Sequence, residues 1–196
     1  MTRINLATED ELSETVALRL VSELLPEFEV GLRLRKGGNG YLRSSFTKFR
    51  KMSRREFVLL ITDLDRVDCA PTLLRSWTNG EELPDRFVFR VCVREIESWI
   101  LADRVGFARL IGVNRAIIPR NPDDLDDPKR SLLQIARRGH NSIRQELLAV
   151  RGTVASQGLG YNRTLCAFAE TDWSLDRARA NSASLQRAVR SLAALA

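Results

Sequence analysis

The chain has 196 residues, of which 44% are hydrophobic and 29% are charged, and its formal net charge is +6. This composition describes a soluble globular protein with one sizeable domain, or a domain with a small appendage. No apolar stretch approaches the length of a membrane span, and no signal-peptide core follows the N-terminus, so we expect a cytoplasmic protein without membrane association. The three cysteines form no CxxC pair, and there is one histidine and no G-x-S-x-G elbow. These absences argue against a zinc cage, a disulfide framework and a Ser-His-Asp hydrolase, and they leave mainly carboxylate chemistry.

The first half of the chain alternates between strand and helix patterns. We expect strands over 4–7, 28–35, 57–61 and 87–93, and helices over 9–25, 41–52, 71–77 and 94–103. Such alternation is typical of a parallel α/β sheet. A polar, turn-rich segment over 121–128 then separates this half from four helical patterns, over 129–138, 142–150, 161–170 and 184–195. The pattern predicts an α/β core over 1–120 and a helical C-terminal extension over 121–196 that packs on it.

The expected strand over 57–61 is apolar throughout and is followed directly by two aspartates. A run of this kind is typical of a strand that is buried on both faces of a parallel sheet. Ligands of open α/β sheets bind beyond the carboxyl ends of such strands, where Asp63 and Asp65 lie. In an extended segment, residues two apart point the same way, so both carboxylates could reach one cation or serve two. A helix cap is the alternative interpretation of these aspartates.

Acidic residues also follow two other expected strands. Glu9 lies after the first strand, and Glu95 and Glu97 lie after the fourth. The carboxyl ends of parallel strands meet on one side, where gathered carboxylates repel one another unless a cation neutralises them. Mg²⁺ prefers a few carboxylates with water and substrate phosphate. The placement predicts a site for Mg²⁺ or Mn²⁺ that is open to a phosphodiester.

Basic residues provide two further features. Between Arg33 and Arg55 the chain has no acidic residue, and this stripe is suited to phosphate backbones or is simply a solvated helix face. Lys129 opens a helix after the acidic turn, where its charge could offset charge on a scissile phosphate or pair with a neighbouring aspartate. The residues predicted to contact nucleic acid are Lys36, Arg43, Lys48, Arg50 and Lys51.

The arrangement resembles Toprim domains, which topoisomerases, primases and OLD-type nucleases share. Thr8-Glu9-Asp10-Glu11 is similar to the first Toprim motif, with Glu9 in the place of its glutamate and Glu11 as the alternative, because Asp10 stands where a glycine is usual. Ile61-Thr62-Asp63-Leu64-Asp65 is similar to the second. A wider set of segments resembles small bacterial Toprim-like proteins of the DUF4276 type: 37–40, 93–103, 127–129 and the late helix at 184–185.

This resemblance implies a small parallel, Toprim- or Rossmann-like sheet flanked by helices. It also implies Mg²⁺-dependent cleavage of DNA or RNA, with a partner ATPase in bacterial defence. The implied catalytic residues are Glu9, Asp63, Asp65, Glu97 and Lys129, and the implied metal ligands are Glu9, Asp63, Asp65, Glu95 and Glu97. Two alternatives stay open: a non-catalytic subunit that binds a partner protein, and a HAD-like phosphatase in which Asp63 of Asp63-Leu64-Asp65-Arg66-Val67 is the nucleophile. Homo-oligomer formation also stays open.

Overall fold

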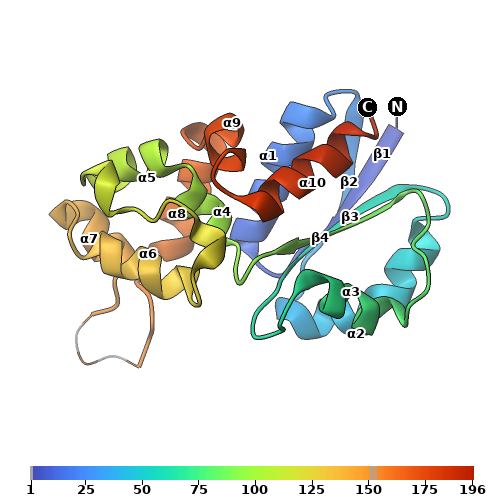
Figure 1. Ribbon diagram of the computed structural model, residues 1–196, viewed down its shortest axis with the longest axis horizontal. Helices are drawn as coiled ribbons and strands as arrows, with labels where there is room; N and C mark the ends of the chain where they lie inside the picture. The colour runs from blue at the N-terminus through green and yellow to red at the C-terminus, as the bar shows by residue number, and fades with distance from the viewer. Residues whose placement is uncertain (1, 151, 153) are drawn as a thin grey trace.

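The computed structural model describes residues 2–150, 152 and 154–196, and it is an α/β structure with helices on both faces of one sheet (Figure 1). The expected alternation of strands and helices is confirmed. The elements of this part are β1 (Thr2–Ala7), α1 (Glu11–Leu24), β2 (Phe28–Leu34), α2 (Gly38–Met52), β3 (Phe57–Asp63), α3 (Ala70–Thr78) and β4 (Phe87–Cys92).

The sheet has four parallel strands in the order β2-β1-β3-β4. The chain moves outward from β1 to β2 and then crosses back to β3 on the other side of β1. The strand order therefore reverses between β1 and β3, which is the position where open α/β sheets bind their ligands. β3 is an inner strand and Val58–Ile61 are fully buried, as its apolar sequence predicted.

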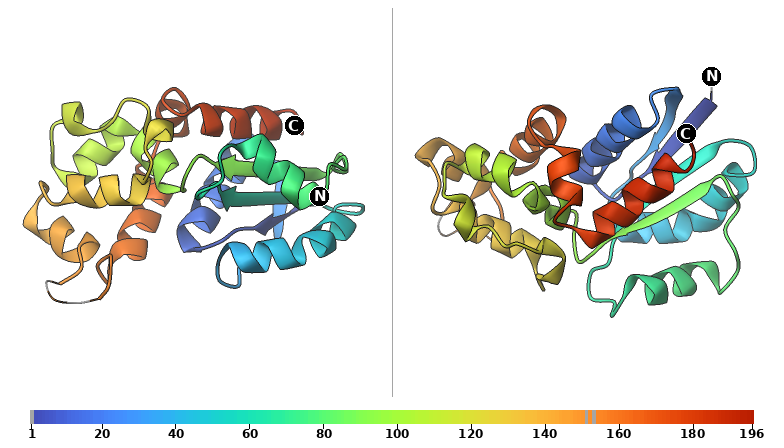
Figure 2. Two further views of the ribbon diagram at one scale, coloured as in Figure 1. Left: turned by 60° about the horizontal axis from the view of Figure 1, so that its bottom comes forward. Right: turned by 45° about the horizontal axis from the view of Figure 1, so that its top comes forward.

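Alternate residues of the inner strands face two separate hydrophobic clusters. Leu6, Leu59 and Ile61 pack with α1 and with α10 (Ala183–Ala193), whereas Val58 and Leu60 pack with α2 and α3. Figure 1 and the right view of Figure 2 show these helix pairs on opposite sides of the sheet. The period-two alternation of a strand explains why one apolar run supplies both cores.

The rest of the chain is helical. Its elements are α4 (Glu97–Ala102), α5 (Arg104–Ile111), η1 (Arg115–Ile117), η2 (Pro122–Asp124), α6 (Pro128–Ala136), α7 (Asn141–Leu147), α8 (Tyr161–Thr171), α9 (Leu175–Arg179) and α10. The four helices expected after residue 121 are present as α6, α7, α8 and α10, while α5 and α9 were not predicted. The helix expected over 94–103 begins only at Glu97, and Arg94 has a left-handed φ of +59°.

The helical extension is packed against the α/β core. α10, the last helix of the chain, contacts α1 and β4 of the core. Its buried residues belong to the same hydrophobic cluster as residues of the sheet. Polar contacts also join distant parts of this region, because the Trp99 indole N–H donates to Ser184 Oγ at 2.7 Å and Arg177 pairs with the fully buried Asp103 at 2.7 Å. The division at residue 120 stays a prediction. No helix within the described ranges is both long and apolar enough to cross a membrane.

Candidate functional site

Glu9 lies directly beside the end of β3. The β1–β3 register pairs Ala7 with Leu60, so Glu9, two residues further on, comes opposite Thr62. Its Oε1 accepts a hydrogen bond from the Asp63 backbone N–H at 2.8 Å and another from the Thr62 hydroxyl. Two acids 54 residues apart in the sequence are therefore brought together at the switch point of the sheet.

The Asp63 side chain has an unpartnered oxygen. Its Oδ1 is buried and has no hydrogen-bond partner among the described residues. Burial raises the pKa of Asp63 well above its usual value, and repulsion from Glu9 and then Glu97 adds to the shift. Burial also raises the pKa of Glu9, although its bonds from Thr62 and Asp63 lower it. Such a carboxylate is destabilised as it stands, and a cation or a hydrogen-bond donor would relieve it.

Two more buried hydroxyls have no partner within the described part of the chain, and both belong to segments that leave the sheet. They are Thr8 Oγ1, next to Glu9, and Ser98 Oγ, in the first turn of α4. Together with Asp63 Oδ1, they place unpartnered polar atoms at the carboxyl end of β3 and in the segments that follow β1 and β4. Buried polar atoms without partners are uncommon, and a polar ligand that binds at this edge of the sheet would satisfy them.

Asp65 has a different local geometry from the one expected. β3 ends at Asp63, and Asp65 is exposed with a left-handed φ of +49°. The extended conformation from which we expected the two carboxylates to point the same way is therefore absent at Asp65. Arg94 donates to the carbonyl oxygens of Asp65 and Val67 at 3.0 and 2.9 Å, and this contact braces the turn.

Asp10 and Glu11 have structural roles. Asp10 is the N-cap of α1, where its Oδ1 accepts from the backbone N–H of Ser13 at 2.8 Å. Glu11 is exposed in the first turn of the same helix. Of the two glutamates considered for the first motif, Glu9 is the one that contacts β3.

Glu95, Glu97 and Lys129 form a second group beside the first. The Lys129 backbone N–H donates to Glu95 Oε2 at 2.9 Å, and the Tyr161 hydroxyl donates to Glu97 Oε1 at 2.7 Å. The Lys129 ammonium lies 5.0 Å from the centre of the Tyr161 ring. The group joins the segment after β4 to the first turns of α6 and α8, which lie beyond the carboxyl ends of the strands (Figure 1).

Glu97 is the most deeply buried acid of this second group, with 4% of its surface exposed. Burial raises the pKa of Glu97 to about 7, against the opposing effects of the Tyr161 hydrogen bond and the Lys129 charge. Sequence reasoning missed Tyr161, because nothing in its local pattern distinguishes it from the start of an ordinary helix. Its partner is 64 residues away.

The predicted basic stripe is partly available for binding. Among the described residues, Lys36, Arg43, Lys48 and Lys51 are exposed and form no ion pair, whereas Arg50 pairs with Glu81 at 2.6 Å. The turn into α2 contacts the acidic site, since the Gly38 N–H donates to the Glu9 carbonyl oxygen at 3.0 Å. From there α2 runs about 20 Å to Lys51 at 1.5 Å per residue. Lys36 and Arg43 are therefore near the acidic site, and Lys48 and Lys51 are far from it.

A three-ligand metal cage is absent from the described residues: no group of three or more histidine, cysteine, aspartate or glutamate side chains is arranged to hold a metal ion. The best-placed pair is Glu9 and Asp63. Two carboxylates fit Mg²⁺ chemistry, because this ion is often held by one or two carboxylates, with water and substrate phosphate at its other positions. Comparisons with protein-family models, curated proteins and solved structures find no match to the chain.

Proposed function

We propose that the chain is a Mg²⁺-dependent nuclease that hydrolyses phosphodiester bonds of DNA or RNA. The observation that carries the proposal is at the switch point of the sheet, where the Glu9 carboxylate accepts a hydrogen bond from the Asp63 backbone N–H while Asp63 Oδ1 is buried and has no partner among the described residues. An open α/β sheet binds its ligand at this position, and a divalent cation is the ligand that two destabilised carboxylates favour most strongly.

Glu9 and Asp63 would hold the cation. When bound, Mg²⁺ supplies Lewis-acid polarisation of a phosphodiester and lowers the pKa of a coordinated water. Asp65 and Glu97 add negative charge around Asp63. A second ion, supported or held by Glu95 and Glu97, stays a prediction from the sequence.

Other residues of this chain would bind the substrate. Lys129 lies beside Tyr161 and Glu97, where its charge offsets negative charge that develops on a phosphate. Lys36 and Arg43 lie at the α2 end that contacts the Glu9 segment, where they would bind the nucleic-acid backbone. A partner ATPase stays a prediction of the sequence resemblance.

The test compares Asp63→Asn with Asp85→Asn in cleavage assays on single- and double-stranded DNA and RNA with Mg²⁺ or Mn²⁺. Asp85 is an exposed aspartate just before β4, at the opposite edge of the sheet, so it controls for the loss of one charge. We expect Asp63→Asn to abolish metal-dependent cleavage while its thermal unfolding stays cooperative, and we expect Asp85→Asn to cleave as wild type does. Cleavage by Asp63→Asn at the wild-type rate would refute the assignment.

A further inference from the structure

The helical part of the protein contains a hollow that is lined by arginines. Arg104, at the start of α5, and the segment 114–120, which contains η1, enclose about 390 Å³. Arg115 and Arg120 are the other charged residues of its wall. The volume corresponds to about a dozen water molecules at about 30 Å³ each, so it admits a group as large as phosphate. Figure 1 shows α5 at the end of the molecule remote from the sheet, so the hollow is separate from the acidic site.

The arginines of this hollow form no ion pair with an acidic side chain of the described residues. From Arg104 to Pro122 the sequence contains four arginines and no aspartate or glutamate. Among the described residues, no ion pair involves Arg104, Arg115 or Arg120. The nearest acid along the sequence on each side is engaged elsewhere, since Asp103 is bound by Arg177 and Asp123 accepts from Ser182 and Ser184. The hollow therefore has concentrated positive charge that no carboxylate of the described chain neutralises.

Arg104 is held in place so that one of its donor groups stays free. Its Nε and Nη2 donate to the Ile118 carbonyl oxygen at 3.1 and 3.0 Å, and Nη2 also approaches the Arg115 carbonyl oxygen at 3.4 Å. No described residue accepts from Nη1. The turn opposite is fixed as well, because Asn114 Oδ1 accepts from the Ala116 N–H at 2.8 Å. A guanidinium ordered before binding loses less entropy when it meets an anion.

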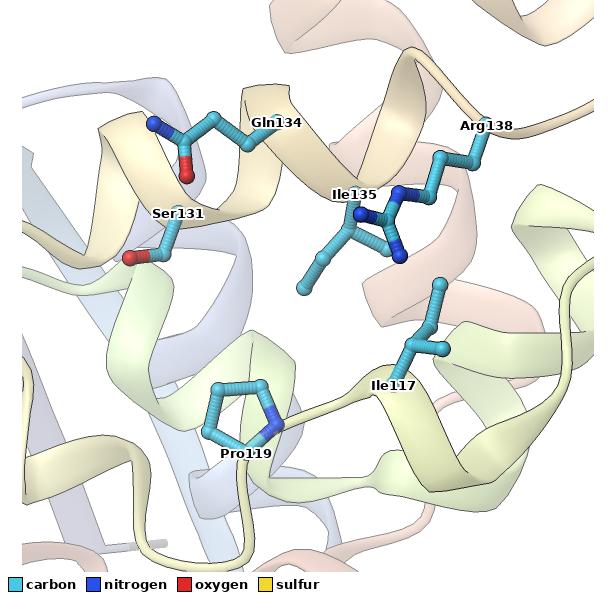
Figure 3. Close-up of a pocket in the computed structure, with 6 residues that line it drawn as sticks. All are labelled: Ile117, Pro119, Ser131, Gln134, Ile135 and Arg138. Carbon is cyan, nitrogen blue, oxygen red and sulfur yellow. The ribbon is translucent and has the colours of Figure 1, made fainter.

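The electrostatic environment also favours an anion. Burial lowers the pKa of Arg104, and repulsion from Arg115 and Arg120 lowers it further. The three charges repel one another in the free protein, and a bound anion would turn this repulsion into attraction. The cationic character continues into a neighbouring hollow of about 210 Å³, which shares Ile117 and Pro119 with the first and includes Arg138 of the α6–α7 turn (Figure 3).

We propose that the arginine hollow is a binding site for a phosphate group. Guanidinium groups match phosphate in geometry and charge, and their charge-assisted hydrogen bonds are among the strongest that proteins form. The phosphate belongs either to a free phosphorylated molecule or to a nucleic-acid backbone. The site does not depend on the proposed nuclease function.

The test measures binding of inorganic phosphate and pyrophosphate by NMR titration in chloride buffer of matched ionic strength, with the Arg104 Nε–H as the reporter. Binding of a labelled single-stranded DNA oligonucleotide is measured in parallel by fluorescence anisotropy. The variant is Arg115→Gln with Arg120→Gln, two exposed side chains that form no ion pair with any residue the structure describes. The charge-matched control is Arg109→Gln with Arg190→Gln, which are exposed and line neither hollow.

We expect saturable binding to wild type and to the control, and at least about tenfold weaker binding to the double variant, because two charge-assisted hydrogen bonds are lost. A backbone source is indicated if the oligonucleotide shows the same loss and phosphate competes with it. A free phosphorylated molecule is indicated if only phosphate and pyrophosphate respond. Equal affinities of wild type and double variant, or no saturable response to any probe, would overturn the proposal. Asp63→Asn should bind phosphate normally, so this test and the nuclease test fail independently.

Discussion

The protonation of Glu97 provides a sharp test of the buried cluster around Lys129 and Tyr161. Glu97→Gln keeps the shape of the side chain, and its amide oxygen can still accept the hydrogen bond from the Tyr161 hydroxyl. The substitution removes the ability to ionise and replaces the other carboxyl oxygen with an amide NH₂ group. Because Glu97 is 4% exposed, its ionised form has little access to water in the folded protein, and the change should appear in the pH dependence of stability.

The magnitude follows from the two pKa values of Glu97. The folded value is about 7 and the unfolded value is 4.5, so between these values the folded state binds more protons than the unfolded state. A raised carboxyl pKa therefore lowers the free energy of unfolding as the pH rises from about 4.5 to about 7, and the loss is complete above that range. Integrated from about pH 5 to about pH 8, the loss is about 2 to 3 kcal/mol. For a chain of this size, that loss lowers Tm by about 4 to 12 °C.

The assay is denaturant unfolding of wild type and Glu97→Gln across this pH range, with a chelator present. The difference between the two proteins isolates Glu97, because the contributions of the other titrating groups largely cancel. Glu97→Gln should gain about 2 to 3 kcal/mol relative to wild type between about pH 5 and about pH 8. Glu27→Gln, at an exposed position, should show no such gain. Parallel stability curves for wild type and Glu97→Gln would show that the reasoning about burial is wrong.

Three further predictions concern stability. Mg²⁺ should raise the Tm of wild type more at higher pH than at lower pH, because burial raises the pKa of Asp63 and of Glu9 and ligation needs their ionised forms. In the same thermal melts it should leave the Tm of Asp63→Asn unchanged. Arg177→Gln should lower the free energy of unfolding by about 2 to 3 kcal/mol, because it leaves the charge of the buried Asp103 without its ion-pair partner. The expected loss is smaller than for a fully buried ion pair, since the Arg177 side chain is 43% exposed. Arg179→Gln, at an exposed ion pair, should lower it by less than about 1 kcal/mol. Leu60→Ala should lower the free energy of unfolding, measured by chemical denaturation, by about 2 to 5 kcal/mol, because Leu60 is fully buried between the sheet and the α2–α3 pair. A smaller loss would mean that neighbouring side chains move to fill the cavity.

Much of the fold could be predicted from the sequence because its signals are local. The apolar run of β3 and the alternation of β2 identify strands through the two-residue period of side chains. The apolar spacing in α1 identifies a helix through the 3.6-residue period. The short helices α5 and α9 were missed, because eight and five residues are too few for a periodic pattern to stand out. The late start of α4 was missed because the left-handed backbone of Arg94 depends on its contacts with the turn after β3.

The candidate site could be predicted only in part. The positions of Glu9 and Asp63 after their strands were readable, because the carboxyl ends of parallel strands share one edge. The left-handed backbone of Asp65 could not be predicted, because no residue near it in the sequence signals that the strand ends at Asp63. The contact of Tyr161 with Glu97 could not be predicted from the sequence either, because it joins α8 to α4 and depends on how these two helices pack.

The sequence by itself determined the class of fold, the strands and longer helices, and the presence of acids at three strand ends. Each of these follows from residues that are neighbours along the chain. Only the tertiary structure decided the strand order, the acid that meets Asp63, the oxygens without partners and the arginine hollow. These features depend on which distant segments pack together, and that choice is made by the burial of whole surfaces and not by any local pattern.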